Sequence, residues 1–409
     1  MRRNDVVRLG LFSICSFVFA LQLAHADVVT EWNQKAVELV YSQGLAGGHQ
    51  TRAVALMHVA IFDAVNSIGG RYSPYRTKLS ANPATSKEAA ASSAAYSVLV
   101  KLFPKQQASL RKDYDASLAV IAEGQPKSDG IALGEKVAAE IIASRAGDGS
   151  EVTEDYKPST TPGVYVPTTV PVFSTWGRVK PWVMKQGSQF RPAPPPVLSS
   201  TTWTQDYNEV RELGRTDSAR RTSDQTEAAR FWLFTGPGTY NPIALQLAVA
   251  RKLGLVENAR MLALLAIASA DAHIAIFDGK YAHNFWRPIT AIRNDATAPD
   301  TRWTPVRDTP MHPEYPCAHC VASTTAGEVL KAVFGAGEIP QVSLTSTTAP
   351  GITRRFTRLD DYITEVSNAR IWAGFHYRNS TTVGEQMGRS LAQYTVQNYL
   401  QPVSVSVGK

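Results

Sequence analysis

One long apolar segment limits the fold of this chain more than any other feature. Residues 258–285 are the longest and most apolar stretch with helical periodicity. A helix that is apolar on most of its surface must be covered by other helices. Because Asp271 and His273 follow closely on the apolar residues 261–270, the stretch does not suit a membrane span, which needs about 20 apolar residues. We therefore predict a buried helix at the centre of the second half of the chain.

Many further segments have the periodicity of amphipathic helices. We expect helices at 27–48, 52–68, 86–103, 105–122, 127–144, 203–214, 224–234, 241–253, 325–334, 359–375 and 383–399. Alternation typical of strands is scarce, and residues 341–344 are the best example. The prediction is a mainly α fold of two packed four-helix-type bundles, with the site in the C-terminal half.

Residues 147–200 differ from the helical segments. They are rich in proline, threonine and serine and have no helical periodicity. A freely moving linker would hardly carry aromatic side chains such as Tyr165, Trp176 and Trp182. We therefore expect a loop that wraps over the body of a single helical domain spanning residues 27–409.

The N-terminus has the features of a secretory signal peptide. Arg2, Arg3 and Arg8 precede an apolar run from Leu9 to Leu23, and Ala24-His25-Ala26 follows as a candidate cleavage site. The alternative is a membrane anchor, but the run is shorter than the roughly 20 residues that a span needs. We predict that residues 1–26 are removed, that the protein is exported to the periplasm or outside the cell, and that no membrane span remains.

Charge and cysteine content limit the partners. The chain has 42 Lys and Arg against 35 Asp and Glu, a net charge of +7, without a run of five basic residues. This balance suits a small anion and does not indicate nucleic acid. Beyond the signal peptide only Cys317 and Cys320 remain, and a zinc site would need a second pair of ligands. We expect a local disulfide. The sequence does not decide between a monomer and a homo-oligomer.

The end of the apolar segment carries two cations. Lys280 and Arg287 stand seven residues apart, and Pro288 follows. If one helix contains both, they lie about 10.5 Å apart along its axis and on nearly the same face. They could then contact one anion from two sides, with Pro288 ending the helix. The alternative is a solvated basic edge of an ordinary helix.

Two further blocks carry histidine and arginine. Residues 316–319 read Pro-Cys-Ala-His, and Arg370 precedes His376 by six positions. Three cations in one place would repel one another, so that a bound oxyanion is a natural counter-charge. The alternative is that nearby acids pair with them. Those acids are Asp271, Asp278, Asp360 and Asp361.

In this order and spacing, the three blocks resemble the signature of the superfamily of vanadium-dependent haloperoxidases and type-2 phosphatidic acid phosphatases. That signature reads Lys-x6-Arg-Pro, then Pro-Ser-Gly-His, then Arg-x5-His, often with Asp four residues after the histidine. Here Cys317 and Ala318 replace Ser and Gly, and Ser380 stands at the Asp position. Residues 368–378 resemble the haloperoxidase branch, and all the motifs lie within 280–380.

The resemblance implies a vanadate cofactor. The residues implied in holding it are Lys280, Arg287, Cys317, Ala318, His319, Arg370 and His376. His376 would bind the vanadium axially, and His319 would be the acid–base group that handles peroxide. The substrates would be hydrogen peroxide and a halide.

The superfamily also implies two alternatives. In a periplasmic acid phosphatase, phosphate would occupy the same pocket. His376 would attack the phosphorus of a phosphate ester and His319 would protonate the leaving oxygen. The third possibility is an inactive homologue that binds an oxyanion without turnover.

The departures from the signature have chemical consequences. A thiol at Cys317 is a weak hydrogen-bond donor, and a disulfide to Cys320 donates nothing. Ser380 cannot supply the carboxylate that orients the nucleophilic histidine in phosphatases of this group, although a carboxylate elsewhere could replace it. This loss weakens the phosphatase hypothesis more than the haloperoxidase hypothesis.

Helix geometry limits the third block. Residues six apart on a straight helix point about 120° away from each other, as Arg370 and His376 would. Both can contact one ligand if the helix ends or loosens around Gly374. Four other polar residues received weaker interpretations. His58 and Asp63 are read as structural, His283 as either a supporting or a surface residue, and His312 as loop.

Overall fold

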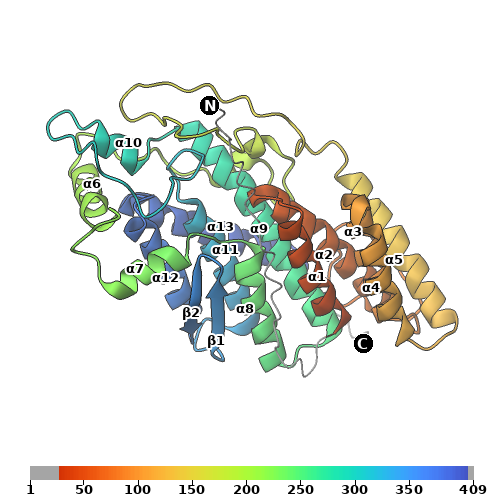
Figure 1. Cartoon of the computed structure of the whole chain (residues 1–409). Coiled ribbons are helices and arrows are strands. Elements are labelled where there is room, and N and C mark those ends of the chain that lie inside the picture. Colours follow the sequence, from red (N-terminus) through yellow and green to blue (C-terminus); the bar gives the residue numbers. More distant parts are fainter. Residues whose placement is uncertain (1–26, 404–409) are drawn as a thin grey trace, which may run out of the picture.

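The computed structural model describes residues 27–403, so the predicted signal peptide at 1–26 lies outside the described part of the chain (Figure 1). The helices are α1 (Val28–Ser42), α2 (Gly47–Gly69), α3 (Lys87–Leu102), α4 (Gln107–Ala119), α5 (Gln125–Ser144), α6 (Thr201–Leu213), α7 (Ser223–Phe231), α8 (Pro237–Ala250), α9 (Leu255–His283), α10 (Pro288–Arg293), α11 (Ala318–Phe334), α12 (Leu359–Trp372) and α13 (Arg378–Asn398). The strands are β1 (Val342–Ser346) and β2 (Ala349–Phe356). The mainly α prediction is confirmed.

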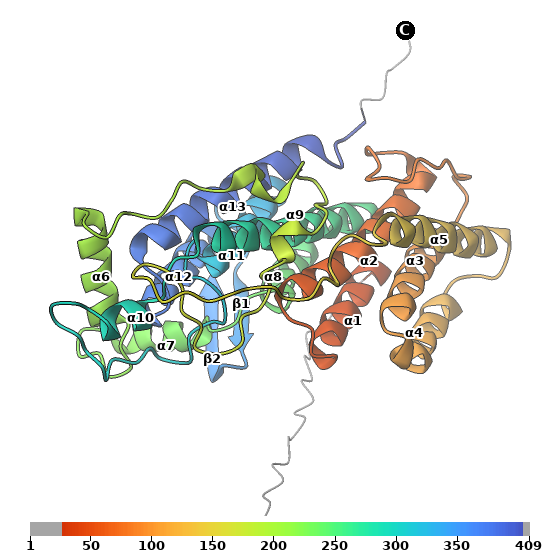
Figure 2. The same cartoon turned by 90° about the horizontal axis from the view of Figure 1, so that it is seen from above.

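Two groups of helices share the long helix α9. In the first group, α2 packs against α1, α3, α5 and α9. In the second group, α11 packs against α9, α12 and α13. Figures 1 and 2 show α3 to α5 at one end of the molecule and α6, α7 and α10 at the other. The end of α9 and the start of α11, which carry site residues, belong to the second group.

Helix α9 is the predicted buried helix. It is long and apolar enough to pass a test for a membrane span, although the sequence reading excluded such a segment here. However, 89% of its most apolar window is buried inside the protein. Packing against the helices of both groups therefore accounts for its apolar composition.

The boundary between α1 and α2 differs from the prediction. A single helix was expected over 27–48, ended by two glycines, but α1 ends at Ser42 and Gly47 begins α2. A Cβ atom on Gly48 would lie 2.1 Å from the ring of Trp176. Gly48 is therefore needed for the close approach of the Pro-rich segment to the first turn of α2, and does not serve as a helix stop.

The Pro-rich residues 147–200 form no α-helix and run across the body of the protein, as the yellow segment at the top of Figure 1 shows. Buried Asp271 of α9 holds this loop, because its carboxylate accepts the backbone N–H groups of residues 182–184 at 2.7–2.8 Å. The side chains of Trp176 and Trp182, which belong to this loop, are buried. Burial raises the pKa of Asp271 to about 6.

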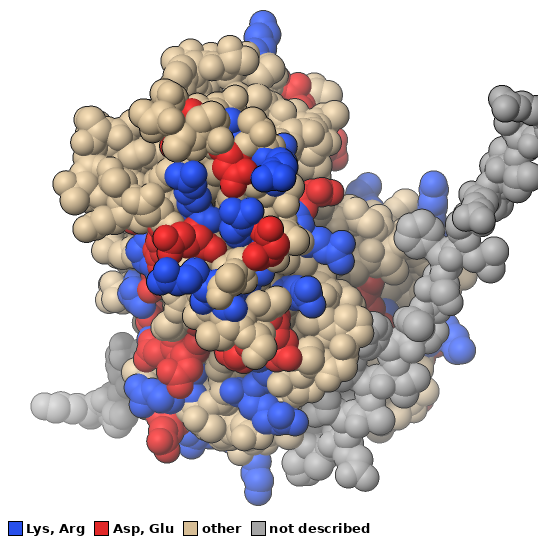
Figure 3. Space-filling view, turned by 60° about the vertical axis from the view of Figure 1, so that its left-hand side comes forward, with Lys and Arg blue, Asp and Glu red and all other residues tan. Residues whose placement is uncertain are grey.

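Residues 341–344 were expected as a weak strand. The structure has β1 at Val342–Ser346, paired antiparallel with β2 beside α8 and α7. On the face turned forward in Figure 3, basic and acidic side chains are interspersed.

Candidate oxyanion site

The predicted site residues converge where α9 ends and α11 begins. Lys280, Arg287, Arg370 and His376 come from four places in the sequence, and each is at most 1% exposed. His319, in the first turn of α11, is partly exposed, but its Nε2 atom is buried. Nη1 of Arg287 lies 3.2 Å from Nε2 of His376. Burial lowers the pKa of both histidines, and the charges of Lys280, Arg287 and Arg370 act in the same direction, so these groups lie close together.

The first block is not one helix, contrary to the prediction. Helix α9 ends at His283 because Asn284 adopts a left-handed conformation with φ of 49°. Arg287 is the N-cap of α10. Lys280 and Arg287 thus approach the site from different elements, and a shared helix face has no part in their convergence.

Lys280 holds the loop that precedes α11. Its Nζ donates to the backbone oxygens of Pro313, Glu314 and Pro316 at 2.8, 2.9 and 2.6 Å. Burial and the neighbouring charge of Arg287 hold the pKa of Lys280 well below its usual range. The side chain therefore fixes the loop and adds positive charge to the site.

Arg287 connects three segments. Its Nη1 donates to Phe375 O at 2.9 Å and approaches Nε2 of His376 at 3.2 Å. Its Nε contacts His312 O and its Nη2 contacts His312 Nδ1, both at 3.0 Å. Burial lowers the pKa of Arg287 to about 10.

These contacts decide which nitrogen of His376 carries the proton. A guanidinium group only donates, so Nε2 of His376 accepts from Arg287. The proton is then on Nδ1, which lies 2.8 Å from Oε1 of Glu314 and donates to it. Burial, followed by the charges of Arg287 and Lys280, keeps the pKa of His376 well below its usual range. Nε2 is therefore unprotonated, and its lone pair faces Arg287.

Glu314 is a site residue that the sequence analysis missed. It is fully buried, and Oε1 also accepts the backbone N–H of Tyr377 at 3.1 Å. Burial raises the pKa of Glu314 to about 7, although Arg287 and Lys280 act in the opposite direction. Glu314 thus provides the carboxylate that Ser380 cannot. An acid two residues before Pro316, inside an otherwise uncharged segment, was the available signal.

The helix of the third block ends before Gly374, as the sequence analysis required for Arg370 and His376 to contact one ligand. Helix α12 ends at Trp372, and Gly374 has φ of +80°, so that His376 lies in a loop between two helices. Nη1 of Arg370 donates to Trp232 O at 2.5 Å, while its buried Nε has no hydrogen-bond partner among the described residues. Burial lowers the pKa of Arg370 to about 9.

The second block forms the start of α11. Cys317 is the N-cap, and the expected Cys317–Cys320 disulfide is present. The first backbone bond of the helix runs from Val321 N to Cys317 O, which leaves the N–H groups of Ala318 and His319 without helical acceptors. Burial and Arg370 keep the pKa of His319 well below its usual range, so the ring is neutral near pH 7.

The four nearby acids do not neutralise the cations. Asp271 binds backbone N–H groups, Asp278 pairs with Arg191, and Asp360 pairs with Lys331. Within residues 27–403, Lys280, Arg287 and Arg370 have no carboxylate within 4.0 Å. Three cations, together with Arg370 Nε and His319 Nε2, which have no hydrogen-bond partner in the described part of the chain, fit a tetrahedral oxyanion. The donor set therefore suits vanadate or phosphate.

The residues that sequence comparison matches include all these groups. Residues 260–404 match the family model described as the VCPO second helical-bundle domain. The vanadium chloroperoxidase of Curvularia inaequalis is 25% identical over 193 residues, which are 39% of this chain and 31% of that protein. Residues 260–404 of this chain are therefore similar to the vanadium haloperoxidases.

Solved haloperoxidase structures share the fold of almost the whole chain. A bacterial vanadium-dependent iodoperoxidase has a TM-score of 0.80 at 24% identity, covering 92% of this chain and 97% of that one. A holo-type bacterial vanadium-dependent chloroperoxidase has a TM-score of 0.75 at 15% identity, covering 92% and 98%. At these identities the likeness concerns the fold. The matched region spans about a third of the curated chloroperoxidase, at 31%.

Three other histidines of this chain have defined contacts. His312, expected as loop, binds Arg287, and its ring lies 5.4 Å from that of Phe277, so it belongs to the site. No sequence pattern marked it. His283 lies 3.0 Å from Pro192 O through Nε2 and thereby supports the Pro-rich loop. His58 binds Asn33 at 2.9 Å in the core.

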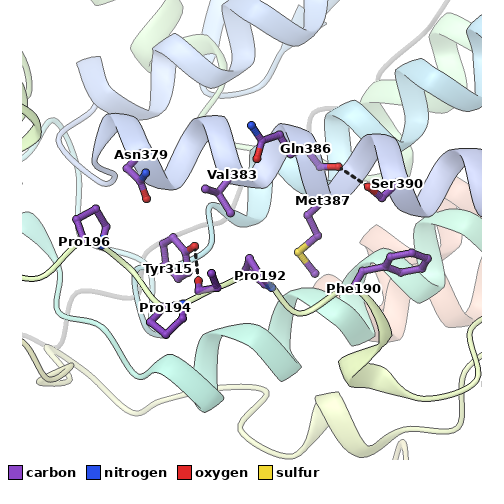
Figure 4. A pocket seen from close by; sticks show the side chains of 11 residues that line it. Phe190, Pro192, Pro194, Pro196, Tyr315, Asn379, Val383, Gln386, Met387 and Ser390 are labelled. Carbon is purple, nitrogen blue, oxygen red and sulfur yellow. Dashed lines mark hydrogen bonds between the residues drawn. The ribbon is translucent and has the colours of Figure 1, made fainter. Parts of the chain in front are cut away.

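A groove of about 440 Å³ lies beside Tyr315, in the loop that Lys280 holds (Figure 4). Side chains of α13 form one wall, and residues 190–196 of the Pro-rich loop form the other. Tyr315 lines the groove and donates to Ala193 O at 2.7 Å. The groove is lined by none of the cations of the oxyanion site.

Proposed function

We propose that this protein is a vanadate-dependent haloperoxidase-like enzyme that oxidises a halide with hydrogen peroxide. The observation that carries the proposal is a buried cluster of Lys280, Arg287 and Arg370 beside a His376 whose Nε2 is unprotonated and faces Arg287. Such a cluster has a strong affinity for an oxyanion, and an imidazole nitrogen is a common ligand of metals. The similarity to vanadium haloperoxidases supports the same conclusion.

Each residue has a task that its surroundings permit. Lys280, Arg287 and Arg370 would offset the negative charge of vanadate, and the free N–H groups at the start of α11 would add donors. His376 would be the ligand through Nε2, held in position by Glu314. When bound, vanadate supplies a Lewis-acidic centre that activates hydrogen peroxide toward a halide.

His319 is placed to move a proton. Its ring is neutral near pH 7, and Nε2 is buried without a partner among the described residues. A neutral imidazole can accept a proton from hydrogen peroxide as the peroxide binds and return it to a leaving oxygen. Arg370, which lowers the pKa of His319, also makes the protonated ring a stronger acid.

One observation supports a phosphatase as the second candidate. The absence of a carboxylate at position 380 weakened that hypothesis, but Glu314 now supplies a carboxylate to Nδ1 of His376. A carboxylate-bound imidazole can attack phosphorus through Nε2. The similarity to haloperoxidases makes halide oxidation the preferred proposal.

The decisive experiment measures bromide and iodide oxidation by hydrogen peroxide, with and without orthovanadate. The proposal expects turnover that requires vanadate and is lost in His376→Ala. The matched control is His283→Gln, because His283 contacts the Pro-rich loop. This variant should retain turnover. Hydrolysis of p-nitrophenyl phosphate without vanadate, with no halide oxidation, would instead support the phosphatase. Phosphate binding with neither activity would identify an inactive homologue.

A further inference from the structure

The Cys317–Cys320 disulfide bridges the first turn of α11, which carries the site residue His319. Both cysteines are fully buried, with their Cα atoms 5.3 Å apart, and His319 stands between them. Cys317 is the N-cap of α11, a helix of 17 residues. The covalent bond therefore closes the helical turn that presents Ala318 and His319 to the site.

This turn has no ordinary cap. A serine at the N-cap position would accept a backbone N–H of the first turn through its hydroxyl oxygen. Here the sulfur of Cys317 accepts from Cys320 N at 3.3 Å, and sulfur is a weak acceptor. The disulfide joins the same two residues covalently, and it thus replaces the cap that the altered motif has lost.

The neighbouring helix leaves little room for the turn to change. The N–H of Cys317 donates to Ser380 O at 3.3 Å. A Cβ on Gly384 would lie 2.9 Å from Cys317 O and 3.0 Å from Cys320 Cβ, so α13 packs directly against the bridged turn. Two sulfurs that are no longer bonded need more space, and the turn must move to give it.

A displaced turn would affect anion binding. The N–H groups of Ala318 and His319 have no helical acceptors, and Nε2 of His319 has no partner among the described residues. Their orientation therefore depends on the backbone of this turn. We propose that the Cys317–Cys320 disulfide is the cap of α11, and that it positions these donors and His319 on the bound oxyanion. The inference rests on the oxyanion site of the proposed function.

The first test compares the oxidised and reduced full-length protein. A dithiol such as dithiothreitol gives two electrons to the disulfide, which becomes two thiols while the reagent becomes a cyclic disulfide. After removal of the reagent, calorimetry measures the binding of inorganic phosphate, an anion that thiols do not reduce. Reduction should weaken binding about fivefold, the effect of losing a cap worth about 1 kcal/mol.

Reoxidation provides the reverse test. Hydrogen peroxide takes two electrons from the two thiols, the S–S bond forms again, and the peroxide leaves as two molecules of water. Phosphate affinity should return to its original value. Circular dichroism and a thiol count on each sample show that the protein stays folded and that the bond has opened or closed.

A pair of variants separates capping from other effects of the bond. Cys317→Ala with Cys320→Ala removes both the bridge and the cap, and should bind phosphate about fivefold more weakly. Cys317→Ser with Cys320→Ala restores a hydroxyl cap, and should regain most of the affinity without responding to dithiothreitol. If the bond served only the general stability of the fold, the two folded variants would bind phosphate with the same affinity.

The inference is overturned if oxidised and reduced protein bind phosphate equally, or if the alanine and serine variants bind it equally. The reduced wild type decides the question even if a variant does not fold. Because phosphate binding requires no turnover, a protein without halide oxidation would refute the proposed function and leave the capping result unaffected.

Discussion

Oε1 of Glu314 lies 2.8 Å from Nδ1 of His376, and the N–H of Tyr377 donates to the same oxygen. The superfamily pattern often has an aspartate four residues after the histidine, where this chain has Ser380. The carboxylate partner of His376 thus comes from the segment before α11. The pairing holds the tautomer in which Nε2 is unprotonated, the form that a metal ligand or a nucleophile requires.

Replacing Glu314 tests this pairing. In Glu314→Gln the partner of Nδ1 is neutral, so that His376 becomes less basic and less firmly oriented. We expect orthovanadate affinity to fall by about 10- to 100-fold, as for other carboxylates that support a histidine ligand. Isothermal titration calorimetry with orthovanadate measures the affinity of the variant and of the wild type.

A carboxylate at position 380, where the superfamily signature often has aspartate, should also support vanadate binding. Burial raises the pKa of Glu314 and Ser380 acts to lower it, so position 380 lies near the carboxylate. Glu314→Gln combined with Ser380→Asp should therefore recover most of the lost vanadate affinity. If the double variant is as weak as the single one, the carboxylate has a role other than binding Nδ1.

Arg287 should be required for binding any oxyanion at this site. Arg287→Ala removes contacts with Phe375, His312 and His376, and leaves their buried acceptors without a donor. We expect phosphate affinity to fall about 30-fold or more. Arg71→Ala, which removes an exposed arginine paired with Glu257, should leave it unchanged. Equal binding by the Arg287 variant would place the anion elsewhere.

Gly374 should be needed for stability and for the position of His376. Its φ is +80°, and a Cβ atom there would lie 2.4 Å from Gly214 O. Gly374→Ala should lower the free energy of unfolding by more than about 2 kcal/mol, from backbone strain together with the clash. Gly335→Ala has φ of +99° but meets no atom within 4 Å, so it should show the strain alone. Urea unfolding measures both, and a similar loss in both would exclude the clash.

Buried His58 should make the protein sensitive to acid. Burial lowers the pKa of His58 to about 3, whereas an unfolded chain protonates this ring near pH 6.5. Between these values the unfolded state binds the extra proton, so stability falls as pH decreases, by about 1.4 kcal/mol per pH unit. His58→Gln keeps an N–H donor for Asn33 but does not titrate. Urea unfolding at pH 7 and pH 5 should show a smaller loss of unfolding free energy in the variant than in the wild type. An equal loss in both would mean that the ring is protonated in the folded state.

Much of the fold was predictable because local patterns carry it. Helical periodicity located most helices, and the apolar segment at 258–285 became α9. The boundary at Gly47 and Gly48 was wrong because the close packing of Trp176 on Gly48, which is distant in sequence, is invisible to a periodicity argument. The helix between Lys280 and Arg287 was wrong because a single left-handed residue, Asn284, ends α9.

The sequence by itself determined the mainly α class, the three motif blocks in order, the adjacent cysteines and the need for a break near Gly374, because each depends on residues close together in the chain. The tertiary structure decided which groups surround the oxyanion site. Glu314 joins His376 across 62 positions and His312 joins Arg287 across 25, through contacts of polar groups that must find partners in three dimensions. No local spacing specifies such partners, because several acids were available and only folding brings one of them to the histidine.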